Sequence, residues 1–356
     1  MSMSAYPASI APLITADQRL VDLTGRARAA LALLNPEDRS LNSVFELSER
    51  NATHRSVAVH SLRLDGCDTS LDLAKGFDQV ERAPQDTGPL GIVDLNDTLA
   101  VQRQEYQCMR DVLSASQTLI PGWLADPIGA LKIIHRMVTN GLATDDTAGR
   151  WRSIDHVMSD SQTGQAIYTP PPSSAVDDLM ADLGLWILGK SWRYDPLVVA
   201  GVVNWRILTV MPFSSANGRV ARLAARLVLL ASEGDMADQL NPEAFWARDI
   251  MAYHREVGAS LRRTGLAQWL SWQVWAIAHS AEHQLRERSS SLRLRAMVHD
   301  DVATYVLGHT QFSIKDFATA CGLSLREATD QLAKARRAGM VLDMPDGMYW
   351  TANAGV

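Results

Sequence analysis

The chain has 356 residues, a length that accommodates two domains of ordinary size and a substantial hydrophobic core. Apolar residues make up 47% and charged residues 21%, which excludes a wholly disordered chain, and the three scattered cysteines exclude a disulfide scaffold. The net charge of −6 excludes the overall basic excess of a nonspecific nucleic-acid-binding protein, although a local basic face is compatible with it.

The N-terminal third reads as helices joined by polar segments. Apolar residues at helical spacing predict a helix from Gln18 to Leu34 and a second one from Leu41 onward. Residues 83–91 contain Pro and Gly and are predicted to form a loop before another helical block near Asp97. The chain shows neither a signal-peptide pattern nor an apolar run of about 18 residues, so we expect a cytoplasmic protein without a membrane partner.

The centre of the chain continues this helical pattern after one irregular segment. Residues 141–172 lose the periodicity and are predicted to form a loop or short hairpin. A helix with an apolar stripe follows, and Ser174 and Asp177 have the spacing of a weak capping box at its start. Further helices are expected over residues 196–210, 219–231, 242–260 and 267–285. The predicted class of the main body is therefore all-α.

Two motif matches in these helices are interpreted as structural. Residues 184–191 satisfy the phosphate-loop pattern GxxxxGK[ST], but that loop follows a strand, whereas an amphipathic helix precedes these residues. We expect a helix end there, with Gly189 as its cap. His279 and His283 have the i, i+4 spacing of metal ligands, yet no third ligand is evident, which favours an ordinary helix face.

The C-terminal residues predict a separate small domain. The polar segment 286–291 is expected to be a linker or a frayed helix end. Residues 312–318 and 325–338 predict a helix-turn-helix, and residues 339–342 and 348–350 predict two strands around an Asp-Gly turn. This order is that of a winged helix.

The second helix of this domain would enter the major groove if the domain binds DNA. The cations expected to contact DNA are Arg326, Lys334, Arg336 and Arg337. Glu327 and Asp330 on the same helix would repel phosphates, so a role in protein contacts or packing is the alternative.

The most informative segment is Met211–Arg222, a loop that leads directly into a helix. Asn217 is expected to cap that helix, and Gly218 permits close approach of a ligand to the backbone. The helix N-terminus, Arg219 and Arg222 would offer amide dipoles and cationic donors to an anion. The same features also occur in ordinary capped surface turns, so the residues alone leave both interpretations open.

The sequence MPFSSANGRVAR resembles the signature HPFx[DE]GNGRxxR of the Fic family, whose members transfer AMP from ATP to protein hydroxyl groups. GRWR at residues 149–152 and YTPPP at residues 168–172 resemble two segments of the family's target-positioning flap, and SLRLDG at residues 61–66 is similar to its inhibitory helix motif [ST]xxxE[GN]. The resemblance covers residues 45–285. It implies a Fic-fold helical bundle with a short β-hairpin flap, and a winged helix is a common companion of that bundle.

The resemblance also implies roles for the half of the segment that matches the signature. Asn217, Gly218 and Arg219 would contact the phosphates of a nucleotide. Arg222 would contact the outermost phosphate or pair with an inhibitory carboxylate. ATP and magnesium would be the cofactors, bound with reduced affinity.

The inhibitory carboxylate implied by the resemblance is Asp65, with Ser61 in the same motif. Asp65 is one methylene shorter than the family's Glu, so a pair with Arg222 would need a closer helix or an intervening water. The alternative for Asp65 is an ordinary charge at a helix end. Other implied positions are Gly149, Arg150 and Tyr168 in the flap and Tyr253 near the adenine.

The departures from the signature fall on the reacting groups. Met211 stands where the family has the His that takes the proton from the target hydroxyl, and a thioether cannot act as a base. Ser215 replaces the acid that holds magnesium, and it is a weaker ligand for a hard cation. Ala216 replaces a glycine, and its methyl group would crowd a phosphate.

We therefore expect a degenerate Fic protein that keeps an anion site and transfers AMP poorly or not at all. The alternatives are a working transferase with a displaced base such as His156, and a regulator that binds DNA or a partner while the Fic body acts as scaffold. The expected partners are an unknown target protein and a second copy of the chain. The expected domains are an N-terminal helical region over residues 1–95, a Fic core over 96–288 and a winged helix over 289–356.

Overall fold

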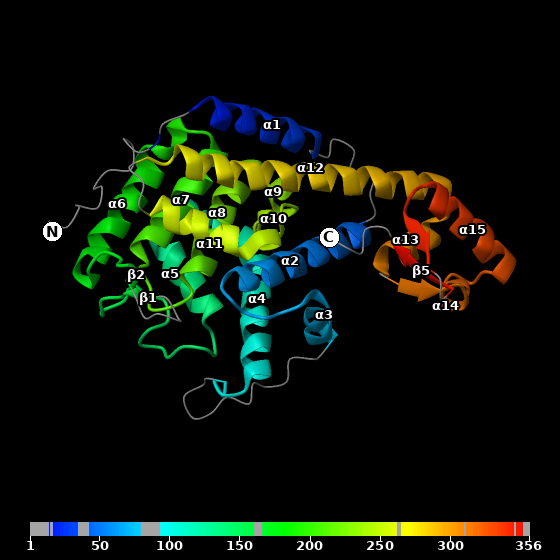
Figure 1. Ribbon diagram of the computed structural model, residues 1–356, viewed down its shortest axis with the longest axis horizontal. Coiled ribbons are helices and arrows are strands. Elements are labelled where there is room, and N and C mark those ends of the chain that lie inside the picture. The colour runs from blue at the N-terminus through cyan, green and yellow to red at the C-terminus, as the bar shows by residue number, and fades with distance from the viewer. Residues whose placement is uncertain are drawn as a thin grey trace. The chain divides into compact units, whose positions relative to one another are not determined.

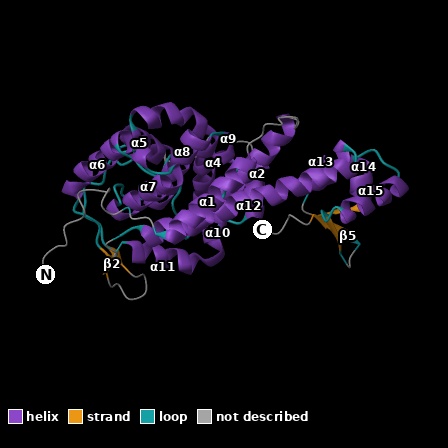
Figure 2. Ribbon diagram, turned by 90° about the horizontal axis from the view of Figure 1, so that it is seen from above, coloured by secondary structure: helices purple, strands orange, loops and turns teal. Residues whose placement is uncertain are grey.

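The protein is represented by a computed structural model that describes residues 14, 17–34, 43–79, 93–159, 166–261, 265–309, 311–344 and 347–351. Helices dominate this part of the chain, as Figures 1 and 2 show, and confirm the prediction of an all-α main body. The described residues divide into two compact units, the first within residues 14–34 and 47–280 and the second within residues 43–46 and 281–351.

Three helices come first in the chain: α1 (Gln18–Leu34), α2 (Ser43–Leu64) and α3 (Leu71–Gln79). The bounds of α1 are those predicted from its apolar periodicity, and Leu20, Leu31 and Leu34 lie on its buried face. The C-terminal half of α2 is buried on several sides, since Val57, Ala58 and Leu62 are at most 1% exposed. The loop predicted for residues 83–91 lies outside the described residues.

The core of the first unit consists of α4 (Thr98–Ala125), α5 (Pro127–Val138), α6 (Val176–Gly189), α7 (Pro196–Val210) and α8 (Asn217–Glu233). All residues of α7 from Leu197 to Val210 are buried, which makes it the central helix. It packs against α8, and α8 also contacts α4 and α5. The loop between α7 and α8 is therefore held by the best-packed elements of the molecule.

Aspartates begin several of these helices. Asp97, Asp126 and Asp195 accept hydrogen bonds from first-turn amides of α4, α5 and α7, and proline is the first residue of both α5 and α7. The capping box predicted at Ser174 is wrong, because Ser173–Ala175 forms the 3₁₀ turn η2 and α6 begins without a side-chain cap.

The phosphate-loop match of residues 184–191 is a helix end, as predicted. Its first six residues belong to α6, which ends at Gly189, and its last residue begins the 3₁₀ turn η3 (Ser191–Arg193). The capping position is Lys190 rather than Gly189.

After α8 the structure differs from the sequence prediction in two places. Residues 242–260 form α10 (Pro242–Trp246), the 3₁₀ turn η4 (Ala247–Asp249) and α11 (Ile250–Ser260) instead of one helix, because Asp249 leaves the helical conformation and caps α11. The linker predicted at 286–291 is also wrong. Helix α12 (Ala267–Met297) continues through it, since Arg and Glu are strong helix formers even without an apolar face. A short helix, α9 (Asp235–Asp238), follows α8.

The hairpin predicted within residues 141–172 is present. Strands β1 (Met158–Ser159) and β2 (Ala166–Tyr168) pair antiparallel, with Met158 opposite Tyr168. These strands form the short flap beside the loop between α7 and α8.

The second unit has the element order of a winged helix: α13 (Asp300–Gly308), β3 (Gln311–Ser313), α14 (Ile314–Ala320), α15 (Leu325–Arg337), β4 (Val341–Asp343) and β5 (Met348–Thr351). The strands form an antiparallel sheet in the order β3-β5-β4. Strand β3 was not predicted, because Phe312 and Ser313 were assigned to the following helix. Ser313 instead caps α14, and Phe312 pairs with Tyr349 and is buried.

The predicted boundary between residues 288 and 289 falls inside α12 and remains a prediction. Among the helices of the described residues, none combines the length and the apolarity needed to cross a membrane.

Candidate functional site

The loop between α7 and α8 turns sharply at both ends. Met211 has φ 47° and Ala216 has φ 56°, and these are the non-glycine residues with positive φ in the part of the chain that the structure describes. The left-handed conformation costs an L-residue about 1–2 kcal/mol. Such outliers are typical of sites where the surrounding structure imposes a particular backbone. Ala216 thus adopts the conformation that a glycine would adopt without strain.

Asn217 closes this loop on itself. Its side-chain Oδ1 accepts from the Phe213 N–H at 2.9 Å, and its Nδ2 donates to the Phe213 carbonyl at 2.9 Å. The prediction that Asn217 caps α8 is wrong, because Asn217 is the first residue of the helix and Ala216 occupies the capping position without a side-chain bond. The Asn217 amide holds the loop in shape rather than facing outward to a ligand.

His135 supports the loop from α5, and the sequence analysis did not single it out. Its ring stacks on Phe213 with centroids 3.9 Å apart, and its Nδ1 accepts from the Gly149 N–H at 2.8 Å. Burial lowers the pKa of His135 to about 4, although the backbone of Ser215 acts in the opposite direction. The ring is therefore neutral at neutral pH and joins the loop to the start of the flap.

Arg152 connects the flap to the loop, and it is only 5% exposed. Its Nε donates to the Met211 carbonyl at 2.8 Å, its Nη1 donates to Ile154 at 3.1 Å, and its Nη2 donates to the Pro171 carbonyl. Its backbone N–H donates to Pro212 at 2.8 Å. One arginine thus organises the carbonyl groups of both segments.

The predicted flap residues have different surroundings. Tyr168 donates its hydroxyl to the Thr209 carbonyl at 2.6 Å. Gly149 has φ +74°, and a Cβ there would lie 2.8 Å from the Lys132 carbonyl, so only glycine fits. Arg150 is exposed. Arg152, rather than Arg150, is the flap arginine that contacts the loop.

The guanidinium of Arg222 is the most enclosed charge at the site. Its Nε donates to the Ser61 hydroxyl and its Nη2 to the Ser61 carbonyl, both at 2.8 Å. Nη2 also bonds Asp65 at 2.7 Å, and Nη1 donates to the Tyr253 hydroxyl at 3.0 Å. The structure thus brings together Ser61, Asp65, Arg222 and Tyr253, all of which the sequence analysis had named.

Asp65 reaches Arg222 directly, without an intervening water. The approach depends on Gly218, because a Cβ at that position would lie 2.4 Å from Asp65 Oδ1. The other oxygen of Asp65 lies 3.5 Å from Nε of Arg219. The carboxylate therefore rests on the first turn of α8, where the positive end of the helix dipole favours an anion.

A second carboxylate, Glu105 on α4, pairs with Arg219 at 3.0 Å. Its other oxygen accepts from the Cys67 thiol at 3.0 Å. Burial, followed by the hydrogen bond to Glu105, raises the pKa of Cys67 to about 12, so the thiol keeps its proton and donates it. Glu105 was not among the predicted site residues, because no local pattern marks it and its partner Arg219 is 114 residues away.

Tyr253 lies inside this cluster and is 4% exposed. Its ring is packed between Trp246 and Trp272, with centroids 6.1 and 5.8 Å away. Its hydroxyl is engaged by Arg222, so in this structure Tyr253 positions the arginine. The contact with adenine stays a prediction.

The front half of the loop lacks reacting groups. Met211 is half-buried and presents a thioether, and Ser215 is exposed. Within the described residues, no group of three His, Cys, Asp or Glu side chains is placed to hold a metal ion. A hydroxyl alone is a poor ligand set for magnesium, which prefers carboxylates and phosphates. The loop as it stands does not fit a magnesium ion.

The cations proposed to contact DNA are partly neutralised. On α15, Lys334 pairs with Asp330 at 3.1 Å and Arg336 pairs with Asp343 at 2.8 Å, whereas Arg326 and Arg337 are exposed. Residues 281–356 contain nine basic and nine acidic side chains. This balance lacks the positive excess typical of DNA-binding domains.

The loop and the flap lie in a segment that matches a known family. Residues 127–229 match the Fic/DOC family. The chain is 26% identical to the protein adenylyltransferase Fic of Nematostella vectensis over 166 residues, which are 43% of this chain and 36% of that protein. The match therefore spans about a third of the relative's length.

Solved structures share the fold. A Fic family protein from Desulfovibrio desulfuricans G20 aligns with a TM-score of 0.63 at 19% identity, over 97% of this chain and 99% of that one. A fragment of Fic-1 from C. elegans aligns with a TM-score of 0.52 at 16% identity, over 76% of this chain and 73% of that one. At these identities the likeness establishes a common architecture.

Proposed function

Residues 127–229 belong to the Fic/DOC family, and from this premise we propose that the chain binds the phosphates of a nucleotide at Arg219, Arg222 and the first turn of α8. In this proposal the site is held closed by Asp65, and AMP transfer is absent or strongly impaired. ATP, when bound, would supply the AMP group that related adenylyltransferases transfer.

One observation carries the proposal: a carboxylate already lies where an anion would bind. Asp65 contacts both arginines and rests against Gly218 at the N-terminus of α8. Forked guanidinium groups at a helix N-terminus favour carboxylate and phosphate for the same reasons of charge and hydrogen-bond geometry. A nucleotide phosphate would therefore compete with Asp65 for these donors.

The charges at the site balance in the closed state. Two guanidinium groups, Arg219 and Arg222, face two carboxylates, Asp65 and Glu105. A phosphate that enters must displace at least the carboxylate of Asp65, because leaving it beside an added anion costs free energy. Glu105 would lower the affinity further, since it would stay paired with Arg219 on the core helix α4.

A second buried ion cluster keeps α2 in this position. Asp238 bonds His54 of α2 at 2.9 Å and Arg226 of α8 at 3.0 Å, and it pairs with Arg50 of α2 at 2.6 Å. Release of Asp65 therefore needs either a local shift at the end of α2 or loss of this cluster as well.

The proposed impairment follows from the side chains at the front of the loop. Met211 cannot accept the proton of a target hydroxyl, and a positioned general base is typically worth about 10²- to 10⁴-fold in rate. Ser215 gives a metal ion little help in neutralising the phosphates. The chain thus retains the donors for binding and lacks the groups for transfer.

Thermal unfolding with ATP, in the presence and absence of magnesium, tests this proposal. A ligand at about 100 times its dissociation constant stabilises a protein by roughly 2.7 kcal/mol, a shift of several degrees at this size. We expect a clear shift for Asp65→Ala, a smaller one for the wild type, and none for Asp65→Ala/Arg219→Ala.

The matched control is Asp68→Ala, which removes an exposed carboxylate three residues beyond Asp65. It should behave as the wild type. If ATP does not shift the unfolding of Asp65→Ala, the arginines are structural and the proposed nucleotide site does not exist.

A further inference from the structure

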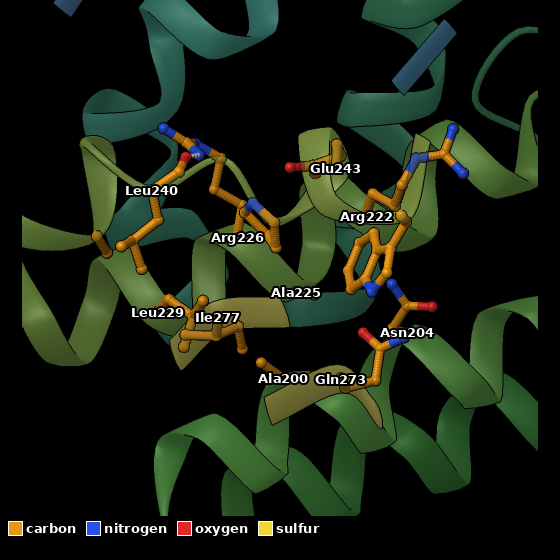
Figure 3. Close-up of a pocket in the computed structure, with 13 residues that line it drawn as sticks. Ala200, Asn204, Arg222, Ala225, Arg226, Leu229, Leu240, Glu243, Gln273 and Ile277 are labelled. Carbon is orange, nitrogen blue, oxygen red and sulfur yellow. Dashed lines mark hydrogen bonds between the residues drawn. The ribbon is translucent and has the colours of Figure 1, made fainter. Parts of the chain in front are cut away.

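A small cavity lies in the first unit beside Arg222, between α7, α8, α10 and α12 (Figure 3). About 20 Å³ of it is open to the centres of water molecules. A buried water needs roughly 10–15 Å³ of such space, so the cavity has room for one water or at most two. Its apolar wall includes Ala200, Leu229 and Ile277.

Polar side chains also line this mostly apolar cavity, and five of their atoms have no hydrogen-bond partner among the described residues. They are Asn204 Oδ1, Arg226 Nε, Glu243 Oε2, Trp246 Nε1 and Gln273 Nε2. The five residues that carry these atoms are buried, with exposed fractions between 1% and 6%. Figure 3 shows Asn204, Gln273, Arg226 and Glu243 arranged around the cavity from different helices.

Buried polar atoms are almost always satisfied, so five such atoms around one cavity indicate a ligand. The other nitrogens of Arg226 are already used, since Nη1 donates to the Leu240 carbonyl and Nη2 to Asp238. This pairing leaves Nε as the nitrogen of the Arg226 guanidinium that has no partner among the described residues. The other four atoms likewise have no hydrogen-bond partner among the described side chains.

The donor and acceptor pattern selects water over an ion. Arg226, Trp246 and Gln273 present N–H donors, whereas Asn204 and Glu243 present oxygen acceptors. An anion would meet the two oxygens, and a cation would meet Arg222 and Arg226. Water donates and accepts, and two to four polar partners are what a buried water uses.

We propose that this cavity is a binding site for one or two buried water molecules, which join Asn204 and Glu243 to the donors of Arg226, Trp246 and Gln273. The site positions Arg222 through Trp246. The indole of Trp246 packs on Trp272 and on Tyr253, whose hydroxyl holds Arg222 at 3.0 Å. A hydrated Trp246 therefore fixes the ring that orients the arginine, whether or not a nucleotide binds.

A crystal structure of the full chain at a resolution that shows ordered water is the direct test. We expect one or two density peaks in the cavity, each within about 2.6–3.2 Å of at least three of the five atoms. Crystals soaked in bromide should show no anomalous peak there. An empty cavity, or a bromide peak, would overturn the proposal.

A measurement in solution tests the same site by counting long-lived waters through the magnetic relaxation of water oxygen-17. Asn204→Leu should lose one or two of them, because the leucine removes an acceptor and fills the space. Ser191→Ala is the control, since its hydroxyl donates to the Ile187 carbonyl of α6 at 2.6 Å and Ser191 does not line the cavity. Equal counts in the wild type and Asn204→Leu would refute the site.

Discussion

The segment Met211–Arg222 has two halves whose side chains differ in what they do. The first half, Met211–Ala216, is the loop between α7 and α8, and the second half, Asn217–Arg222, begins α8. In the second half, Asn217, Arg219 and Arg222 are buried, and each makes side-chain contacts with other residues. In the first half, Ser214 and Ser215 are exposed, and Met211 is engaged through its backbone. The first half is an irregular loop and the second half is helical, and only the second half retains groups that suit an anion.

The backbone conformation of the loop and its reactive side chains therefore depend on different residues. The shape depends on Arg152, His135 and Asn217, which bond or stack with backbone groups and with Phe213. None of these contacts requires a histidine at position 211 or an acid at position 215. The reacting groups can therefore be replaced while the loop keeps its conformation.

The strongest test of this difference restores the two reacting groups in the first half of the segment. In an Asp65→Ala background, Met211→His with Ser215→Asp should raise AMP transfer by about 10²- to 10⁴-fold, which corresponds to roughly 3 to 5.5 kcal/mol of barrier. Histidine tolerates the left-handed backbone at this position better than most residues. Self-labelling measured by intact mass gives the rate.

Adding Arg219→Ala to the restored protein should abolish that gain. A restored protein that remains inactive would show that the second half of the loop no longer binds a nucleotide productively. The Asp65→Ala protein without the restored residues should be inactive. If it already transfers AMP and His156→Ala removes that activity, the general base lies in the flap, and transfer does not need a base in the first half of the segment.

The support for the loop shape can be tested at Arg152. Arg152→Met leaves the carbonyls of Met211, Ile154 and Pro171 without this donor in a buried place, so we expect a loss of about 3 kcal/mol in the free energy of unfolding. Urea denaturation measures it. Arg150→Met, on an exposed arginine two residues earlier, should stay within about 0.5 kcal/mol. Equal effects of the two variants would contradict the role given to Arg152.

The pH dependence of stability tests His135. Its folded pKa of about 4 lies below the ordinary value of 6.5, so the unfolded state binds more protons between these values. The free energy of unfolding should therefore fall by about 3 kcal/mol from this group as the pH drops from 6.5 to 4. His135→Phe should flatten the profile in that window. Parallel profiles of the two proteins would mean that the ring titrates normally.

The smallest expected effect concerns Gly218 in the second half. Gly218→Ala should cost about 1–3 kcal/mol, because the added carbon would lie 2.4 Å from Asp65 Oδ1. In an Asp65→Ala background the same change should be neutral or slightly stabilising, since alanine favours a helix. Thermal unfolding of the four proteins gives the coupling. Gly25→Ala, with open space around it in α1, is the control in both backgrounds.

Much of the helical framework could be predicted from periodicity, because the helices bury one face and their apolar residues recur accordingly. The bounds of α1 and α7 agree with the sequence. The prediction failed where a polar cap or a neighbour decided the outcome. Asp249 interrupts a continuous apolar pattern, and α12 continues through a polar segment that lacks one.

The residues of the candidate site could also be predicted only in part. Its arginines and the replaced reacting groups stand together in one stretch of sequence. No sequence pattern indicates Glu105 or His135, because their partners, Arg219 and Phe213, are far away in the chain. Arg150 is the predicted flap arginine, whereas in the structure Arg152 is the one that is buried and bonds the loop.

The amino-acid sequence alone specifies the reactive groups of this segment: a thioether at Met211, a hydroxyl at Ser215 and the guanidinium groups of Arg219 and Arg222. Folding cannot change which groups are present. The contact of the shorter Asp65 with Arg222 at 2.7 Å, in contrast, arises from the packing of the folded chain. That contact depends on how closely α2 packs against α8, which the buried residues of α2 and the missing Cβ of Gly218 set together.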